Sequence, residues 1–491
     1  MSSSILVVDV GTSSVRSSLV HPDGAVTNTH QVAVLPTSPA PGLVEIDARG
    51  IATAALETAR AVMEIAGSVA AVGIANQRAS SIVWDRATGE VLGPAIGWQD
   101  LRTVIQCLVL QGEGLRLAPN VSATKYQAIL DEVDPDRTRS AAGELCCGTV
   151  DTYVAWHLSG GTVFATDASN AGVTGLVNAS ITDYDDHVLE VLRIDRATLP
   201  KICDTSGIIG AASALHGAPP IAGMAGDQQA SLIGQGAIAP GDAKITFGTG
   251  GMLNMVTGPD APSTAARGPH GTFPIVAQRR AGRTLWGLEA IMLSAGTCIE
   301  WLRDDLGFFD HASDSDALAA SCTTTDGVTF VPAFLGLGTP TWDFGARGAL
   351  LGLTRGTGRA EITRAVLDGI AQRGADLVEA AEAESGHTLA TIRVDGGMSA
   401  NATFVGLLAN ATGRPVERSS ELEATTRGAG FLAGLGVGTY SSVEEIAALV
   451  QPADVIDPSI SDDERAAARA TWLDRRARAE GTIPDLSGVQ F

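Results

Sequence analysis

The sequence predicts an α/β protein built from two domains. A chain of 491 residues is longer than one ordinary hydrophobic core allows, so we expect two domains of about 200–250 residues each. Strand-like runs alternate with helical runs, and each half opens with two apolar strands joined by a turn of small residues. Because these openings are hairpins and not strand–helix–strand units, we expect mixed sheets and disfavour a plain Rossmann fold.

The elements can be placed in chain order from their patterns. Apolar runs over 5–10 and 15–20 predict the first hairpin. Apolar residues at helical spacing predict a helix over 51–65, followed by a buried strand over 69–75. Early acids and an amphipathic pattern predict a long helix over 361–384. We further expect strands over 391–394 and 414–418, a helix over 401–412 and a charged surface helix over 461–478.

The domain boundary is expected where glycine and proline accumulate, over 235–241. The second hairpin begins directly afterwards, at Lys244. We therefore assign residues 1–236 to an N-terminal domain and residues 237–491 to a C-terminal domain. Each predicted domain starts with the same hairpin device, although the two halves share no detectable sequence repeat.

Composition narrows the class of protein. Hydrophobic residues make up 45% and charged residues 18% of the chain, which is typical of a well-packed globular protein. A net charge of −22 without any basic run argues against nucleic-acid binding. No apolar run approaches the roughly 20 residues that cross a bilayer, and no signal-peptide pattern follows Met1. We therefore expect a cytoplasmic protein with no membrane partner, whose six scattered cysteines are reduced thiols.

The turn of the first hairpin carries residues suited to binding phosphate. Thr12, Ser13 and Ser14 offer hydroxyl groups beside the backbone N–H groups of a glycine-containing turn. Asp9 and Arg16 flank the turn and are suited to a magnesium ion and to phosphate oxygens, respectively. The turn is not a Walker loop, because no G-K-[ST] follows it. Taken alone, it could equally be an ordinary hairpin turn.

Two companion motifs favour the phosphate-binding interpretation. Gly248 and Thr249 lie in the turn of the second hairpin. Gly396 and Gly397 follow a predicted strand and precede a helix that starts near Asn401, a geometry that can seat a phosphate or a nucleoside. Three such motifs in one chain predict a two-lobed enzyme that holds ATP from both sides.

Asp227 and Gln228 are the catalytic candidates at the predicted domain boundary. An acid at this place would lie at the mouth of a cleft between the domains. Phosphoryl transfer mainly needs alignment, charge stabilisation and an acceptor for the proton of the attacking hydroxyl. A carboxylate beside an amide that orients the substrate fits this task. In isolation, Asp227 could equally be a turn or helix-cap acid.

Arg78 and Trp98 are candidates for binding the group that is phosphorylated. Arg78 follows a buried strand, and its planar fork of donors can grip vicinal hydroxyls or a carboxylate. Trp98 offers a flat apolar face against which the carbon side of a polyol can rest. Without further context, Trp98 could equally be a partly buried core aromatic.

With these residues assembled, the chain resembles the FGGY family of carbohydrate kinases from about residue 5 to about residue 439. So many matches in the same order make chance similarity implausible. The matching motifs are Asp9-x-Gly-Thr-x-Ser-x-Arg16, Asn76-Gln77-Arg78, Trp98-Gln99, Gly148-Thr-Val-Asp-Thr152, Thr166-Asp167-x-x-Asn170, Gly226-Asp-Gln-Gln-Ala230, Phe247-Gly-Thr-Gly250, Trp301-Leu-Arg-Asp304, Val331-Pro-Ala-Phe334, Trp342-Asp343, Arg347-Gly348, Gly352-Leu-Thr-Arg355 and Arg393-Val-Asp-Gly-Gly397 with Asn401.

The resemblance implies a fold, an activity and a set of roles. The fold is a duplicated ribonuclease-H-like domain, as in actin, hexokinase and Hsp70, with ATP in the interdomain cleft. The activity is transfer of the γ-phosphoryl group of ATP, with Mg²⁺, to a terminal hydroxyl of a small polyol or sugar by a homo-oligomer (dimer or tetramer). The implied roles are Asp227 as proton acceptor; Asp9 and Asp227 near the metal; Thr12, Ser13, Ser14, Arg16, Gly248 and Thr249 at the phosphates; Gly396, Gly397 and Asn401 at the nucleotide; and Arg78, Ala79, Trp98, Asn120, Asp227, Gln228 and Met252 around the acceptor.

Three positions around the acceptor pocket, and Val10 next to the first phosphate turn, depart from the pattern of the glycerol kinases within that family. Ala79 stands where they usually carry Glu, Asn120 where they carry Tyr, and Met252 where they carry Phe. Losing a group that hydrogen-bonds a substrate hydroxyl changes discrimination by roughly 10⁴ or more. A four- or five-carbon alditol or a ketose, such as erythritol or xylulose, is therefore an alternative acceptor to glycerol.

Two other classes of function are less consistent with these residues than a kinase. An actin- or Hsp70-like ATPase switch would need no acceptor pocket, so Arg78, Trp98 and Gln228 argue against it. A degenerate relative that binds sugar without transferring phosphate would not need both acids, so Asp9 and Asp227 argue against that class.

Overall fold

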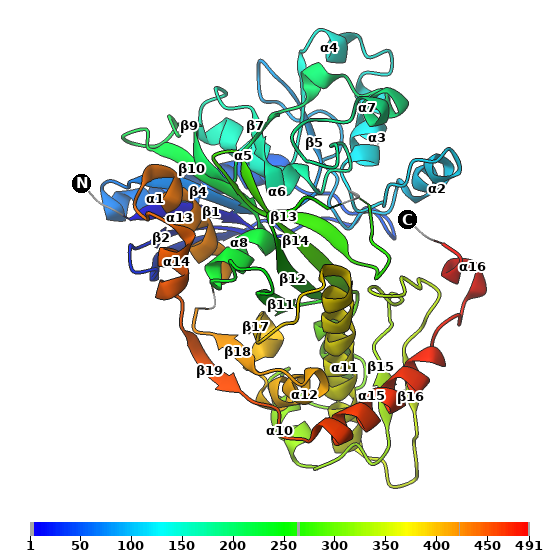
Figure 1. Cartoon of the computed structure of the whole chain (residues 1–491). Helices are drawn as coiled ribbons and strands as arrows, with labels where there is room; N and C mark the ends of the chain where they lie inside the picture. Colours follow the sequence, from blue (N-terminus) through cyan, green and yellow to red (C-terminus); the bar gives the residue numbers. More distant parts are fainter. Residues whose placement is uncertain (1–3, 263–265, 422, 490–491) are drawn as a thin grey trace.

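The computed structural model describes residues 4–262, 266–421 and 423–489. In this part of the chain, one mixed sheet of 13 strands runs through both halves in the order β19-β18-β17-β11-β12-β14-β13-β9-β10-β4-β1-β2-β3. Figure 1 shows earlier residues, in blue to green, forming the upper part of the molecule, and later residues, in yellow to red, forming much of the lower part.

The N-terminal half contains a five-strand unit. β1 (Ile5–Val10), β2 (Ser14–Val20) and β3 (Val26–Ala33) form consecutive antiparallel pairs, which confirms the predicted first hairpin. β4 (Ala71–Asn76) pairs parallel to β1 on its other side, and β10 (Pro220–Gly226) pairs parallel to β4. The order within this unit is therefore β3-β2-β1-β4-β10.

The C-terminal half repeats this order and these directions. β11 (Ala243–Phe247), β12 (Gly251–Gly258) and β14 (Arg283–Met292) form antiparallel pairs. β17 (Ile392–Asp395) pairs parallel to β11, and β18 (Val416–Ser419) pairs parallel to β17. The two matching units confirm the predicted duplicated α/β fold with mixed sheets.

Three more strands complete the large sheet. β9 (Ser206–Ala211) and β13 (Phe273–Arg280) join the two units through a parallel contact at Ser206 and Arg280. β19 (Pro452–Ile456) forms the edge beside β18.

The helices cover both faces of each unit. Leu6, Val8 and Val10 of β1 point into a core with α1 (Ala48–Ala66), the helix predicted over 51–65. In the C-terminal half, α11 (Arg359–Ser385) and α12 (Ala402–Thr412) form one core with the apolar residues of β11, and both match predicted helices.

The other face of the N-terminal unit is covered by a helix from late in the chain. Ile5 and Val7 of β1 share a core with Phe431 and Leu432 of α13 (Ala424–Val437). Residues after 423 thus pack on a sheet that begins near residue 5, while the division of the chain at residue 236 stays a prediction.

The predicted surface helix over 461–478 is α15 (Asp462–Ala477), which begins with a capping box between Ser461 and Glu464. Its Arg469 Nη2 donates to Asp376 Oδ1 of α11 at 2.7 Å, and Trp472 Nε1 donates to the same oxygen at 3.2 Å. These buried contacts fix an otherwise exposed helix to the C-terminal half.

The remaining elements lie in the connections. They are β5 (Ile82–Asp85), α2 (Val104–Gly112), α3 (Ala123–Val133), α4 (Thr138–Ala141), β6 (Leu145–Gly148), α5 (Val150–Leu158), β7 (Ala165–Asp167), α6 (Ala168–Ala171), α7 (Asp186–Leu192), η1 (Arg196–Thr198), β8 (Lys201–Cys203), α9 (Gly296–Asp304), α10 (Asp314–Ala320), β15 (Thr329–Val331), β16 (Ala349–Leu351), η2 (Gly397–Ala400), α14 (Val443–Leu449) and α16 (Pro484–Ser487). Over the described residues, no helix has both the length and the apolar character that crossing a membrane requires.

One short helix lies where the two halves meet. α8 (Asp227–Gly234) contacts β4 and β10 of the N-terminal unit as well as β12 and β13 of the C-terminal half. Figure 1 shows α8 near the middle of the molecule, close to α13. The two helices touch through glycines: a Cβ on Gly234 would lie 1.9 Å from the carbonyl oxygen of Ala424, and a Cβ on Gly428 would lie 1.8 Å from that of Ala230. Only hydrogen fits at these two positions.

We expect Gly428→Ala to lower the thermal midpoint of unfolding, because its new methyl group would force α8 and α13 apart at a cost of about 1–3 kcal/mol or more. Gly406→Ala is the matched control: Gly406 also lies inside a helix, but its added Cβ would meet open space. That control should be neutral or stabilising by about 0.5–1 kcal/mol. Circular dichroism during heating measures both, and equal midpoints for the two variants would contradict the proposed close packing.

Candidate active site

Asp9 is a buried acid at the end of the first strand. It lies directly opposite Arg16 on β2, whose Nε is 3.5 Å from Asp9 Oδ2, and Thr426 Oγ1 donates to the same oxygen at 3.2 Å. Burial raises the pKa of Asp9 to about 6, although Arg16 opposes this shift. Arg16 is held in turn by Glu423, which accepts from its Nη1 at 2.5 Å. The positive charge near Asp9 is therefore too small to offset the cost of burying its carboxylate.

The first predicted phosphate turn presents free donors. Ser14 is buried, whereas Thr12 is half-buried and Ser13 is exposed. The turn is closed by the N–H of Gly11, which donates to the carbonyl of Ser14 at 3.0 Å. The N–H groups of Thr12 and Ser13 donate to no residue that the structure describes. The turn thus has the unpaired N–H groups that an anion-binding concavity needs.

The second and third predicted phosphate motifs lie next to each other. Gly248 and Thr249 are exposed at the tip of the second hairpin. Gly396 has φ +85°, and a Cβ there would lie 2.4 Å from the carbonyl oxygen of Phe247, so only glycine lets β17 end against this hairpin. Asn401 caps α12, because its Oδ1 accepts from the N–H of Phe404 at 2.8 Å.

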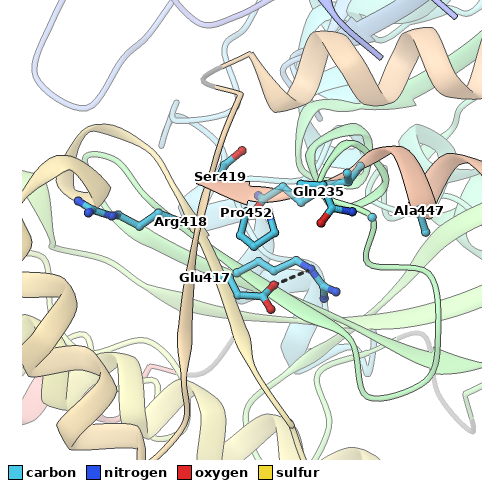
Figure 2. Close-up of a pocket in the computed structure, with 10 residues that line it drawn as sticks. Gln235, Glu417, Arg418, Ser419, Ala447 and Pro452 are labelled. Atoms are coloured by element: carbon cyan, nitrogen blue, oxygen red, sulfur yellow. Dashed lines mark ion pairs between the residues drawn. The ribbon is translucent and has the colours of Figure 1, made fainter. Parts of the chain in front are cut away.

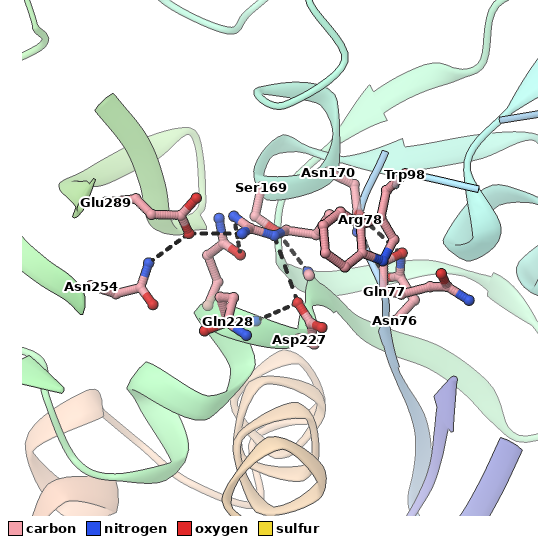
Figure 3. Close-up of polar contacts among 12 residues, drawn as sticks. Asn76, Gln77, Arg78, Trp98, Ser169, Asn170, Asp227, Gln228, Asn254 and Glu289 are labelled. Carbon is pink, nitrogen blue, oxygen red and sulfur yellow. Dashed lines mark hydrogen bonds and ion pairs between the residues drawn. The ribbon is translucent and has the colours of Figure 1, made fainter. Parts of the chain in front are cut away.

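Arg78 is the centre of the site, and residues from both halves hold its guanidinium (Figure 3). Its Nε lies 3.6 Å from Asp227 Oδ1, and its Nη2 donates to Glu289 Oε2 at 2.7 Å. Its Nη1 reaches Gln229 Oε1 at 3.5 Å. Asp227, the first residue of α8, is half-buried, and burial raises its pKa while Arg78 opposes the rise.

Glu289 was not predicted from the sequence. It lies on β14 directly opposite Asn254 of β12, whose Nδ2 donates to Glu289 Oε2 at 2.9 Å, and Asn254 in turn lies opposite Lys244 of β11. Met252 shares the face of Asn254, because side chains two residues apart on a strand point the same way. Lys244, Asn254 and Glu289 thus form a polar row across three neighbouring strands. The only sign of this row in the sequence is that these polar residues interrupt otherwise apolar strands.

A contact between Gln228 and Lys244 connects the residues predicted to bind the acceptor to this polar row. Lys244 is fully buried, and its Nζ donates to Gln228 Oε1 at 2.6 Å and to Thr246 Oγ1 at 2.6 Å. Burial lowers the pKa of Lys244, whereas the negative charge of Asp395 and other nearby acids raises it. Like Glu289, Lys244 was not predicted as a site residue, because its partners depend on strand register, which the local sequence does not show.

A buried polar network supports the strand that carries Arg78. Asn76 and Asn170 exchange two amide hydrogen bonds of 2.9 and 3.0 Å, and Asp167 accepts from Asn170 Nδ2 at 2.8 Å. Gln77 Nε2 donates to the carbonyl of Gly11 at 3.1 Å, which ties this strand to the first phosphate turn. Figure 3 shows Asn76, Gln77 and Asn170 beside Arg78 and Trp98.

Trp98 links the acceptor candidates to the phosphate turn. Its Nε1 donates to Thr12 Oγ1 at 3.5 Å, and its backbone N–H donates to Ser80 Oγ at 3.1 Å. Trp98 is half-buried, so part of the indole is left to contact a ligand.

The structure gives less evidence that Ala79 and Asn120 belong to the acceptor pocket. Ala79 is buried with φ +60°, a conformation that is strained for alanine, and its carbonyl accepts from Ser122 Oγ at 3.1 Å. Asn120 lies two residues before Ser122 and is exposed. No hydrogen bond among the described residues joins its side chain to Arg78 or Asp227, so its place in the acceptor pocket stays a prediction.

A pocket of about 140 Å³ lies next to Gln235, the residue that follows α8, and neither Arg78 nor Asp227 lines it (Figure 2). It is lined by Gln235, whose Nε2 donates to Asp395 Oδ2 at 2.9 Å, and by two arginines. Arg393 pairs with Asp242 and Glu417, and Arg418 pairs with Asp454. Because both guanidinium groups are already paired, the pocket offers no free cation for an anionic ligand.

The duplicated fold, in which each half opens with a hairpin and buried charged residues lie where the halves meet, is typical of one class of protein, the two-domain phosphotransferases. Comparison with family models agrees with that class. Residues 4–234 match the N-terminal domain of the FGGY family of carbohydrate kinases, and residues 243–437 match its C-terminal domain. The chain belongs to the FGGY family of carbohydrate kinases.

Individual relatives give a finer comparison. The chain is 43% identical to the glycerol kinase of Aromatoleum aromaticum over 98% of this chain and 99% of that protein. Among solved structures, the Plasmodium falciparum glycerol kinase with ADP superposes with a TM-score of 0.90 at 26% identity, covering 100% of this chain and 99% of that one. The ligand-bound xylulose kinase of Lactobacillus acidophilus has a TM-score of 0.85 at 22% identity, covering 99% of each chain, which shows the shared fold alone.

We expect Asp9→Asn to stabilise the protein in the absence of nucleotide and metal. A folded-state pKa of about 6 against an ordinary value of 3.8 means that the charged form of Asp9 opposes folding above pH 6. Removing that charge should add on the order of 3 kcal/mol at pH 7–8, and the gain should fade as the pH falls from about 6 toward 4.

Thermal unfolding at several pH values measures this effect, with Asp305→Asn as the control because Asp305 is exposed. The control should change little at any pH. A less stable Asp9→Asn protein, or a gain that does not depend on pH, would contradict the burial effect.

Proposed function

We propose that this chain is an ATP-dependent kinase of a small polyol, with glycerol as its acceptor. The observation that carries the proposal is the position of Arg78. Asp227 and Glu289 hold its guanidinium from the two halves of the chain, at distances of 3.6 and 2.7 Å. A paired cation and an acid with a raised pKa at this junction suit the transfer of a phosphoryl group to a hydroxyl.

Asp227 is proposed as the acceptor of the hydroxyl proton. As the acceptor oxygen bonds to the γ-phosphorus, the bond from that phosphorus to the leaving ADP oxygen breaks, and the hydroxyl proton passes to an Asp227 oxygen. A base with a pKa nearer the working pH is the more efficient one, and burial shifts the pKa of Asp227 in that direction. Arg78 keeps the Asp227 carboxylate in place while the acceptor is bound.

The two hairpin turns are proposed to bind the phosphates of ATP. Thr12 and Ser13 present free N–H groups from one half, and Gly248 and Thr249 lie at an exposed turn of the other. Ser14 and Arg16 complete the first turn, whereas Gly396, Gly397 and Asn401 are proposed to lie at the nucleoside end.

The residues present fit a magnesium ion that arrives with the nucleotide. Mg²⁺ usually takes one or two protein carboxylates together with substrate phosphates, and when bound it neutralises phosphate charge. Asp9 and Asp227 are the proposed carboxylates. In the described part of the chain, no group of three or more potential metal-binding side chains forms a closed site, so a dedicated protein cage is not proposed.

Glycerol is favoured over the larger acceptors. The relatives named glycerol kinase match nearly the whole chain at about 40% identity, whereas the xylulose kinases match at a level that shows only the fold. Glu289 also places a carboxylate beside Arg78, although position 79 is alanine. A four- or five-carbon alditol or ketose, and an actin- or Hsp70-like ATPase switch, are therefore less favoured. A cytoplasmic location and a homo-oligomer (dimer or tetramer) remain proposals.

The first test is an ADP-release assay across glycerol, erythritol, xylulose and other three- to six-carbon polyols and sugars. We expect ATP consumption to depend on an acceptor and kcat/KM to be highest for glycerol. Preference for a larger acceptor would overturn glycerol as the acceptor, and acceptor-independent hydrolysis would favour the ATPase switch.

Asp227→Asn should lower kcat by about 10²–10⁴-fold while leaving ATP binding intact, because the amide cannot take the proton.

We expect Glu289→Gln to move the acid limb of the kcat/KM profile to lower pH. The negative charge of Glu289 raises the pKa of Asp227. Glu289 and Asp227 also both attract the positive charge of Arg78. Without that charge, Arg78 acts on Asp227 alone, the pKa of Asp227 falls, and its active, deprotonated form persists to lower pH. Glu300→Gln removes the same charge from an exposed site on α9 and should leave the limb in place. An unmoved limb in Glu289→Gln would contradict this coupling.

A further inference from the structure

Lys244 is an unusual residue for the middle of a strand. Its side chain is fully buried, although lysine is almost never buried without a partner. On β11, Ile245 and Phe247 point into the C-terminal core, so Lys244 and Thr246 point to the opposite face. That face meets α8, whose first residues are Asp227 and Gln228. Lys244 thus reaches the acceptor side of the site from the nucleotide half.

The contacts of Lys244 restrict how Gln228 can lie. An ammonium group has three donors and no acceptor, so the side-chain oxygen of Gln228, and not its nitrogen, must face it. Nζ of Lys244 lies 2.6 Å from Gln228 Oε1 and 2.6 Å from Thr246 Oγ1. Burial lowers the pKa of Lys244, and the carboxylates of Asp395, Asp227 and Glu289 oppose that shift by favouring its charged form.

The orientation of the Gln228 amide leaves its nitrogen available. Nε2 of Gln228 donates to no residue that the structure describes, and the side chain is half-buried. Figure 3 shows Gln228 next to Asp227 and below Arg78. An amide with its oxygen engaged can offer a ligand only its two N–H donors.

We propose that Lys244 is a positioning residue that fixes the Gln228 amide, so that Gln228 donates a hydrogen bond to an oxygen of the acceptor. This inference rests on the proposed kinase function. The site then separates two tasks: Asp227 accepts from the hydroxyl that is phosphorylated, and Gln228 donates to a second oxygen, which can be a hydroxyl or a carbonyl. A free amide would rotate and would bind either a donor or an acceptor group.

A double-mutant cycle tests whether Lys244 acts through Gln228. In the full-length enzyme, Lys244→Met should lower kcat/KM for the best acceptor by about 10- to 100-fold, since it removes a charge-assisted hydrogen bond. Gln228→Ala should cause a loss of similar size. If Lys244 acts only through Gln228, then Lys244→Met should add less than about 2-fold in the Gln228→Ala background. The KM for ATP should stay within about 2-fold of wild type throughout.

The outcomes separate this inference from the proposed function. If wild type phosphorylates none of the polyols and sugars, the proposed function fails. If wild type is active but the two losses multiply, or the KM for ATP rises with the Lys244 variant, Lys244 has a general structural role and the inference is overturned.

A second variant covers the case in which Lys244→Met does not fold. Gln228→Glu keeps a side-chain oxygen against Lys244 and should fold, because a carboxylate pairs well with a buried ammonium. It leaves no N–H donor for the acceptor, so we expect kcat/KM to fall by about 10-fold or more. Wild-type kcat/KM in folded Gln228→Glu would overturn the assignment of Gln228 as a donor.

Discussion

The site depends on one buried cation that both halves of the molecule must neutralise. Arg78 belongs to the N-terminal unit, and its nearest strong partner, Glu289, lies 211 residues later on a strand of the C-terminal half. A charge that stays buried but loses its partner costs several kcal/mol, so Arg78 and Glu289 must keep their contact as long as the site is shielded from water. The Arg78–Glu289 pair therefore fixes how Asp227 lies relative to the phosphate turns of both halves.

The polar row on the C-terminal sheet has a single geometric origin. Lys244, Asn254 and Glu289 lie opposite one another on three neighbouring strands, so they project from the same face toward α8. Each then reaches a different partner: Lys244 holds Gln228, and Glu289 holds Arg78 while it also accepts from Asn254. The C-terminal half thus places side chains beside Arg78 and Gln228 of the N-terminal half, and it does so through fixed strand register.

Sequence patterns predicted the parts of the molecule that depend on neighbours in the chain. Both hairpins, the long helix α11 and the helix α15, which begins at the capping box of Ser461, follow from local periodicity and caps. Glu289 and Lys244 could not be assigned a role in this way, because their partners are set by strand register and by packing between distant segments. The same holds for α13, an alanine- and glycine-rich helix whose core partners begin near Ile5. Local sequence cannot show which sheet such a helix will cover.

Burial shifts the pKa values of three charged groups at the centre, Asp9, Asp227 and Lys244, toward the neutral forms. The pKa values of Asp9 and Asp227 are raised, and that of Lys244 is lowered. Each shift reports free energy that the folded protein loses by keeping a charge there without a ligand. A nucleotide with its cation would bring both signs of charge into the site and relieve part of that loss. If Asp9 and Asp227 bind the cation of the nucleotide as proposed, the same two buried acids link binding energy to stability, and more stable residues at these positions would bind the ligands less well.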